Sequence, residues 1–99
     1  MKKNLNYFVK ERKTIIKNGV IYNRYTTKKH LCISEKNAYN WLNVYLSKYA
    51  LMMESWEMNY HEVDIMVKSV KLENKKLSIK YTRASDLTDI KLEYYISLE

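Results

Sequence analysis

The clearest pattern of apolar positions lies in the middle of the chain, from Ser34 to about Trp56. Eight apolar or aromatic side chains recur there at the i, i+3, i+4 and i+7 spacing of one helix face: Ala38, Trp41, Leu42, Tyr45, Tyr49, Met52, Met53 and Trp56. Ser34 suits the N-cap position, and Glu35 places a negative charge near the positive end of the helix dipole. We therefore predict one long amphipathic helix over 34–56, with Trp41 and Trp56 on its buried stripe.

The chain before this helix predicts a β-hairpin from Tyr7 to Ile33. Two apolar runs flank Asn18-Gly19, a pair that suits a type I′ turn because both central residues need positive φ. A regular hairpin would place Lys17 opposite Val20 and, further out, would pair Ile15 with Tyr22, Lys13 with Arg24, Arg12 with Tyr25 and Lys10 with Thr27. Neither face of the outer hairpin is cleanly apolar, so we expect it to stand partly free of the core as a two-stranded arm.

Three further strands are predicted after the helix. Apolar residues alternate from Val63 to Val67, and the alternation then shifts phase to Val70 and Leu72, which indicates a β-bulge near Lys68-Ser69. Residues 73–76 form a turn, and alternation resumes over 77–82 and, after a loop at 84–88, over 90–98. The order ββαβββ predicts an α+β fold, with one long amphipathic helix packed on a mainly antiparallel five-stranded sheet.

Length and composition favour a single domain over 1–99, made of a basic β-hairpin (1–33), a helix (34–56) and a three-stranded antiparallel sheet (62–99). The one cysteine, Cys32, has no internal disulfide partner, which fits a reducing compartment, and we interpret it as a small buried hydrophobe. The N-terminal charges are not followed by an apolar run, and no stretch is long enough to span a membrane. We therefore expect a cytoplasmic protein with no membrane association.

The charge of the chain is concentrated at one end. Residues 1–30 hold nine Lys or Arg against a single acid, Glu11, whereas residues 61–99 hold seven of each sign. Since basic side chains interleaved with tyrosines suit a phosphate backbone or a groove, we expect the hairpin to bind nucleic acid or another anionic partner. The predicted binding residues are Lys10, Arg12, Lys13, Lys17, Tyr22, Arg24, Tyr25, Lys28 and Lys29.

Two of the predicted hairpin pairs bear on this interpretation. Lys13 opposite Arg24 would be an unfavourable like-charge pair that a bound anion relieves, and Arg12 opposite Tyr25 would be a cation–π pair. The alternative is a solvated edge hairpin whose lysines only prevent aggregation.

Residues 22–30 and 34–42 resemble the N-terminal arm-type DNA-binding domains of phage integrases. In those domains a small sheet carries basic residues, and a helix opens with a polar-Lys-x-x-Ala-x-x-Trp-Leu pattern, which Glu35 to Leu42 resembles with one residue fewer between Lys36 and Ala38. The resemblance covers about a fifth of the chain, which lacks an integrase catalytic domain and continues into three more strands.

Candidate catalytic groups are few. Gly19 is the only glycine, which excludes Gly-rich phosphate loops and nucleophile elbows. Asp64 followed by Glu73 and Lys75 loosely matches the Asp…Glu-x-Lys pattern of metal-dependent nucleases, but Glu73 and Lys75 fall in a predicted turn, where we expect solvated charges.

The histidines give no metal site either. His61 would point away from Glu62 and Asp64 on a regular strand, and His30 is far from it in the sequence, so both are expected at the surface. We expect no catalytic residues, no metal, no cofactor and no enzymatic activity.

The back of the predicted helix offers a second surface. Lys48 is the only charge between Lys36 and Glu54, although a solvated helix back usually carries Glu/Lys pairs. Neutral polar residues (Asn37, Asn40, Asn43 and Ser47) surround Val44 and Leu51, which sit together seven residues apart. A protein interface at Val44, Leu51, Asn40 and Ser47 is one interpretation, and chance under Asn-rich residue usage is the other.

These observations predict a small non-catalytic binding protein. Abundant Lys, Asn, Ile and Tyr with one Gly and no Pro is typical of AT-rich genomes, and we expect a phage or mobile-element protein. Its partner would be nucleic acid or a nucleoprotein effector complex, as for an anti-CRISPR-type inhibitor in host defence evasion; a DNA mimic is disfavoured by the charge of +7. The alternatives are a module that binds only protein (a host protein or a second copy, through the helix back or a sheet edge) and a metal-dependent nuclease.

Overall fold

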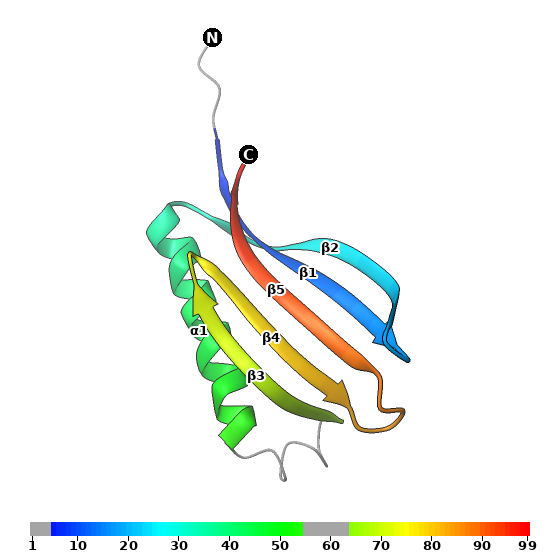
Figure 1. Ribbon diagram of the computed structural model, residues 1–99. Helices are drawn as coiled ribbons and strands as arrows, with labels where there is room; N and C mark the ends of the chain where they lie inside the picture. Colours follow the sequence, from blue (N-terminus) through cyan, green and yellow to red (C-terminus); the bar gives the residue numbers. More distant parts are fainter. Residues whose placement is uncertain (1–4, 55–63) are drawn as a thin grey trace.

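The computed structural model describes residues 5–54 and 64–99, which form one helix and five strands. The elements are β1 (Tyr7–Lys17), β2 (Val20–Cys32), α1 (Glu35–Glu54), β3 (Ile65–Glu73), β4 (Lys76–Arg83) and β5 (Asp89–Leu98). The strands form one antiparallel sheet in the order β2-β1-β5-β4-β3, and α1 lies on one face of it (Figure 1). The predicted α+β fold with ββαβββ order is confirmed.

Helix α1 begins where the sequence places its N-cap. The Ser34 hydroxyl accepts a hydrogen bond from the Asn37 backbone N–H at 3.1 Å, which satisfies one of the free donors of the first turn. Most of the predicted apolar stripe faces the sheet: Ala38, Leu42, Tyr49 and Met52 are buried, and Trp41 and Tyr45 are half-buried. Met53 was expected on this stripe but is 38% exposed, because it lies at its edge near the end of the described helix. The predicted last turn of the helix, including Trp56, lies outside the described residues.

The core lies between α1 and the sheet face beneath it. That face contributes Val9 from β1, Val67 from β3, Leu77, Ile79 and Tyr81 from β4, and Ile90, Leu92 and Tyr94 from β5. These residues alternate with side chains that point to the other face, as the period of two in a strand requires. Burial of this apolar surface is the main stabilising contribution, and it fixes which side chains each strand presents on the face opposite α1.

The first hairpin turns where predicted, but its outer register differs. Asn18 and Gly19 have φ of 52° and 76°, and Lys17 pairs with Val20. A bulge between Ile15 and Ile16 then shifts the pairing by one residue. The observed pairs are Ile15 with Asn23, Lys13 with Tyr25, Thr14 with Arg24, Arg12 with Thr26 and Lys10 with Lys28, so the four outer pairs expected of a regular hairpin are wrong.

The prediction of a free-standing arm is also wrong. Residues Tyr7–Ile16 of β1 pair with Asp89–Leu98 of β5, which places β1 inside the sheet. The physical reason is Val9, which is fully buried beneath the helix, because an apolar residue at that position stabilises β1 as part of the core. Only β2 is an edge strand of this hairpin, and its residues 20–29 are exposed.

The C-terminal strands follow the sequence pattern closely. The register shift predicted near Lys68-Ser69 lies between Val67 and Ser69. Asn74 and Lys75 have φ of 52° and 59°, as a tight hairpin turn between β3 and β4 requires.

An aromatic cluster under the first half of α1 was not predicted. The His30 ring stacks on Trp41 with centroids 3.7 Å apart, and its Nε2 shares a 2.8 Å hydrogen bond with the Tyr45 hydroxyl. His30 is therefore half-buried, not at the surface as expected; this burial, and secondarily the nearby Lys29 charge, lower its pKa. Cys32, only 2% exposed, is the buried small hydrophobe that the sequence predicted, and burial raises the pKa of its thiol.

Candidate nucleic-acid interface

The sheet face opposite α1 is covered by no element among the described residues, and we call it the open face. Its residues follow from the register. On β1 they include Lys10, Arg12 and Thr14, because these alternate with the inward-facing residues of that strand. The same alternation places every second residue of the other strands on this face.

Basic side chains dominate the open face. It carries nine cations, which come from all five strands: Lys10, Arg12, Arg24, Lys28, Lys68, Lys71, Lys76, Lys80 and Lys91. Four described carboxylates lie on the same side: Glu73, Asp89, Glu93 and Glu99. This face therefore holds most of the excess positive charge of the described chain.

Four of these cations follow one line across the sheet. Arg24 on β2 pairs with Thr14 on β1, Thr14 pairs with Lys91 on β5, and Lys91 pairs with Lys80 on β4. The row reaches β3 at the bulge that contains Lys68. We call Arg24, Lys68, Lys80 and Lys91 the basic row.

The basic row lines a groove of about 500 Å³. Ile16 and Ile21 contribute apolar side chains to this groove, and Asp89 is the one acid among the described residues that line it. The Asp89 carboxylate accepts a 2.8 Å hydrogen bond from the Thr82 hydroxyl, so one of its oxygens already has a partner. The groove thus presents four positive charges against one negative charge.

Ion pairs leave the basic row free. Lys10 and Lys28 pair with Glu99, and their hydrogen bonds to its carboxylate lower the pKa of Glu99 to about 2; Lys71 pairs with Glu73, and Lys76 with Glu93. By contrast, no carboxylate of residues 5–54 and 64–99 forms an ion pair with Arg12 or with any member of the basic row. Among the described cations of the open face, these five are the ones available to an external anion.

Glu93 lies in the middle of this positive field. Burial would raise its pKa, but the 2.9 Å hydrogen bond from Lys76 and the charges of Lys91 and Arg12 outweigh burial and lower the pKa of Glu93. The carboxylate is therefore ionised at neutral pH; it forms its ion pair with Lys76, and its charge also attracts Lys91 and Arg12.

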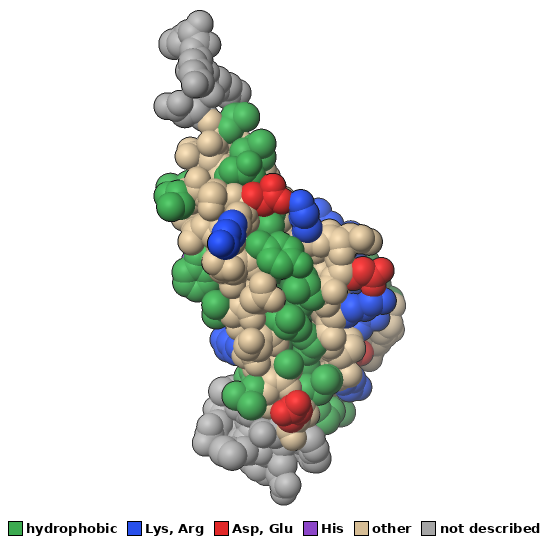
Figure 2. All heavy atoms as spheres, turned by 90° about the vertical axis from the view of Figure 1, so that its left-hand side faces the viewer, with side chains coloured by type: hydrophobic (Ala, Val, Ile, Leu, Met, Phe, Trp, Pro, Cys, Tyr) green, Lys and Arg blue, Asp and Glu red, His purple; other side chains and the backbone are tan. Residues whose placement is uncertain are grey.

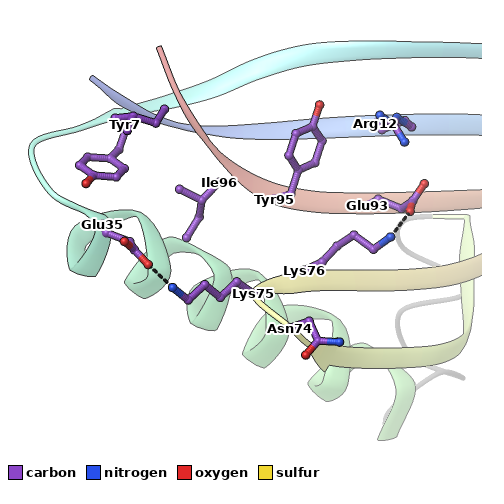
Figure 3. A pocket seen from close by; sticks show the side chains of 10 residues that line it. Tyr7, Arg12, Glu35, Asn74, Lys75, Lys76, Glu93, Tyr95 and Ile96 are labelled. Carbon is purple, nitrogen blue, oxygen red and sulfur yellow. Dashed lines mark hydrogen bonds and ion pairs between the residues drawn. The ribbon is translucent and has the colours of Figure 1, made fainter. Parts of the chain in front are cut away.

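A second hollow of about 530 Å³ lies where β5 runs past the β3–β4 turn (Figure 3). Tyr95 stands beside it, and the Arg12 guanidinium lies 5.6 Å from the centre of the Tyr95 ring. Lys75 and Lys76 approach from the turn and are held by Glu35 and Glu93. Arg12 thus makes its cation–π contact with Tyr95, and the Arg12–Tyr25 pair expected from the regular hairpin is wrong.

The structure divides the predicted binding residues between two faces. Lys10, Arg12, Arg24 and Lys28 lie on the open face. Lys13 and Tyr25 point to the α1 side, where Lys29 also lies 3.8 Å from Glu11. Lys17 and Tyr22 lie near the hairpin turn, with the Lys17 ammonium 4.3 Å from the Tyr22 ring centre. One flat partner therefore contacts only part of the predicted set.

Sequence reasoning missed Lys68, Lys80, Lys91 and Tyr95. Residues 61–99, which include their strands, hold seven acids and seven bases, so a count of charge along the chain gave no signal. The available signal was alternation: Lys80 and Lys91 flank buried residues of β4 and β5, which places both on the face opposite the helix. Alternation does not predict that β1 pairs with β5. That pairing brings the cations of the first hairpin beside Lys80 and Lys91.

The helix back has the exposure that its sequence predicts. Val44 is 54% exposed and Leu51 is 63% exposed, with Asn40 and Ser47 exposed beside them. Figure 2, which faces the α1 side, shows apolar side chains along the middle of this side and few charged ones. The interface predicted here stays a prediction.

The described residues assemble no metal site: in 5–54 and 64–99 no three His, Cys, Asp or Glu side chains gather in a metal-binding arrangement. Asp64 precedes β3 and Glu73 ends it, so the two carboxylates of the nuclease-like pattern are separated by about 30 Å of extended strand. His61 and Glu62 lie outside the described residues.

No helix of the described chain has the length and apolar character of a membrane span. Comparison of the chain with protein-family models, with curated proteins and with solved structures gives no significant match.

Proposed function

We propose that this protein is a non-catalytic nucleic-acid-binding protein that holds the phosphate backbone of its partner on the open face of the sheet. The observation that carries the proposal is the basic row, in which four cations from four strands line one groove that has a single carboxylate among its described lining residues. Arrays of cations of this kind supply the sequence-independent part of nucleic-acid affinity.

The row also contains an arrangement that costs stability. Lys80 and Lys91 lie directly opposite each other on β4 and β5, and like charges in that relation are unfavourable. Neither lysine has an ion-pair partner among the described carboxylates. A bound phosphate relieves this repulsion, which gives the pair a role in binding.

The biological setting that we propose follows from residue usage and charge. A phage or mobile-element protein with this surface would bind nucleic acid directly or dock on a nucleoprotein complex, for example as an anti-CRISPR-type inhibitor of host defence. In either case the contact would run through the same cations.

Substitution of the basic row tests the proposal. One variant carries Arg24→Gln, Lys68→Gln, Lys80→Gln and Lys91→Gln. The matched control carries Lys13→Gln, Lys17→Gln, Lys36→Gln and Lys48→Gln, which remove the same number of charges away from the open face. Binding of fluorescein-labelled DNA and RNA oligonucleotides is measured by fluorescence anisotropy, with circular dichroism to verify folding.

We expect the control to keep most of the affinity of the unmodified protein and the basic-row variant to lose it. Equal losses in the two variants would mean that only net charge matters, and the open face would then have no special role. If the unmodified protein binds no oligonucleotide at low salt, the proposed function is wrong.

A further inference from the structure

We infer that the open face takes single-stranded nucleic acid, with a base stacked on Tyr95 and the strand running along β5 to the basic row. This inference rests on the proposed function and narrows it to one class of partner.

The shape of the sheet argues against insertion into a duplex groove. The major groove is about 12 Å wide and admits a two-stranded ribbon or a helix. The β1–β2 ribbon is not free to enter it, because β1 is paired with β5 along Tyr7–Ile16. The open face is five strands wide, or about 19 Å across, so the cations lie on a platform that is wider than the groove.

Exposed sheet platforms suit single strands for a chemical reason. An unpaired base offers its flat face to an aromatic side chain, while cations beside it follow the backbone. Tyr95 meets the first requirement: it is half-buried on the open face and borders the hollow of about 530 Å³ at the end of β5.

The cations around Tyr95 meet the second requirement. Lys10 and Lys76 are its cross-strand neighbours, and the Arg12 guanidinium lies over its ring, 5.6 Å from the ring centre. Lys91, in the basic row, is four residues earlier on the same strand, a distance of about 13 Å. A strand with one base on Tyr95 therefore has positive charge beside that base and further along its backbone.

Tyr95 variants and a pair of ligands test the inference. Tyr95→Leu removes the aromatic ring and keeps an apolar side chain, whereas Tyr95→Phe keeps the ring. Tyr25→Leu is the control, since Tyr25 is 43% exposed but points to the α1 side. Each protein is titrated against a fluorescein-labelled oligothymidylate and a labelled duplex of the same length, in one buffer.

We expect the oligothymidylate to bind more tightly than the duplex. Tyr95→Leu should weaken single-strand binding roughly five- to 150-fold, the range for loss of one base stack, with little change for Tyr95→Phe and Tyr25→Leu. Duplex binding as tight as single-strand binding, or unchanged single-strand affinity in Tyr95→Leu, would overturn the inference and leave the proposed function standing. Binding of neither ligand would overturn both.

Discussion

The dependence of affinity on salt gives the sharpest test of the cation arrangement. Five cations of the open face lack a described carboxylate partner: Arg12, Arg24, Lys68, Lys80 and Lys91. If each contacts one phosphate of a single strand, the slope of log K against log salt is about −3.5, since each contact contributes about 0.7. Substitution of the basic row with glutamine leaves Arg12 alone and a slope of about −0.7.

These slopes differ enough to measure easily. Between 50 and 200 mM KCl the affinity of the unmodified protein should fall roughly 130-fold, and that of the basic-row variant only about two- to threefold. Anisotropy titrations of a labelled oligothymidylate at several KCl concentrations give both slopes. The control variant with substitutions at residues 13, 17, 36 and 48 should keep the steep slope. A steep slope in the basic-row variant would refute the reasoning, because the phosphates would then be held elsewhere.

Three further predictions concern stability and pH, each measured by urea unfolding. Leu42→Ala should lower the free energy of unfolding by about 2–5 kcal/mol, since Leu42 is fully buried; a loss below about 1 kcal/mol would contradict the packing of α1. Lys80→Gln should raise it by roughly 0.2–1 kcal/mol by removing the repulsion with Lys91, and a loss of stability would contradict this explanation. The folded pKa of His30 lies below 6.5, so the unfolded chain takes up protons first on acidification and stability should decrease as pH falls through about 6.5. His30→Gln should flatten this dependence, and an unchanged pH profile would exclude His30 as its source.

The fold was largely predictable because its signals are local. The Asn18-Gly19 turn, the Ser34 N-cap and the phase shift at Lys68-Ser69 each specify a conformation within a few residues. The Ile15–Ile16 bulge gave no such signal, because the exposed side chains of β2 constrain its register weakly. The pairing of β1 with β5 is non-local: these strands are more than seventy residues apart in the sequence, and no local pattern selects one strand as the partner of another.

The candidate site was predictable only in part, for the same reason. The basic character of Arg12 and Arg24 was evident from the sequence, but their neighbours on the open face come from the electrically neutral end of the chain. Lys80 and Lys91 appear balanced in a count of charges, although some of the acids counted, such as Asp86, lie in a loop and not on this face. Charge summed along a sequence therefore underestimates charge gathered on a surface.

The central place of β5 in the sheet has a consequence for biosynthesis. β5 lies between β1 and β4, so it joins the hairpin made first to the hairpin made after the helix. Before β5 has been synthesised, no strand joins the β1–β2 hairpin to the β3–β4 hairpin. The apolar face of each hairpin is then not yet packed against the rest of the core. Folding can finish only after Asp89–Leu98 has emerged, and closure of so long a chain segment is slow relative to local contacts. Until then the cations of β2 protect its exposed edge from pairing with other nascent chains.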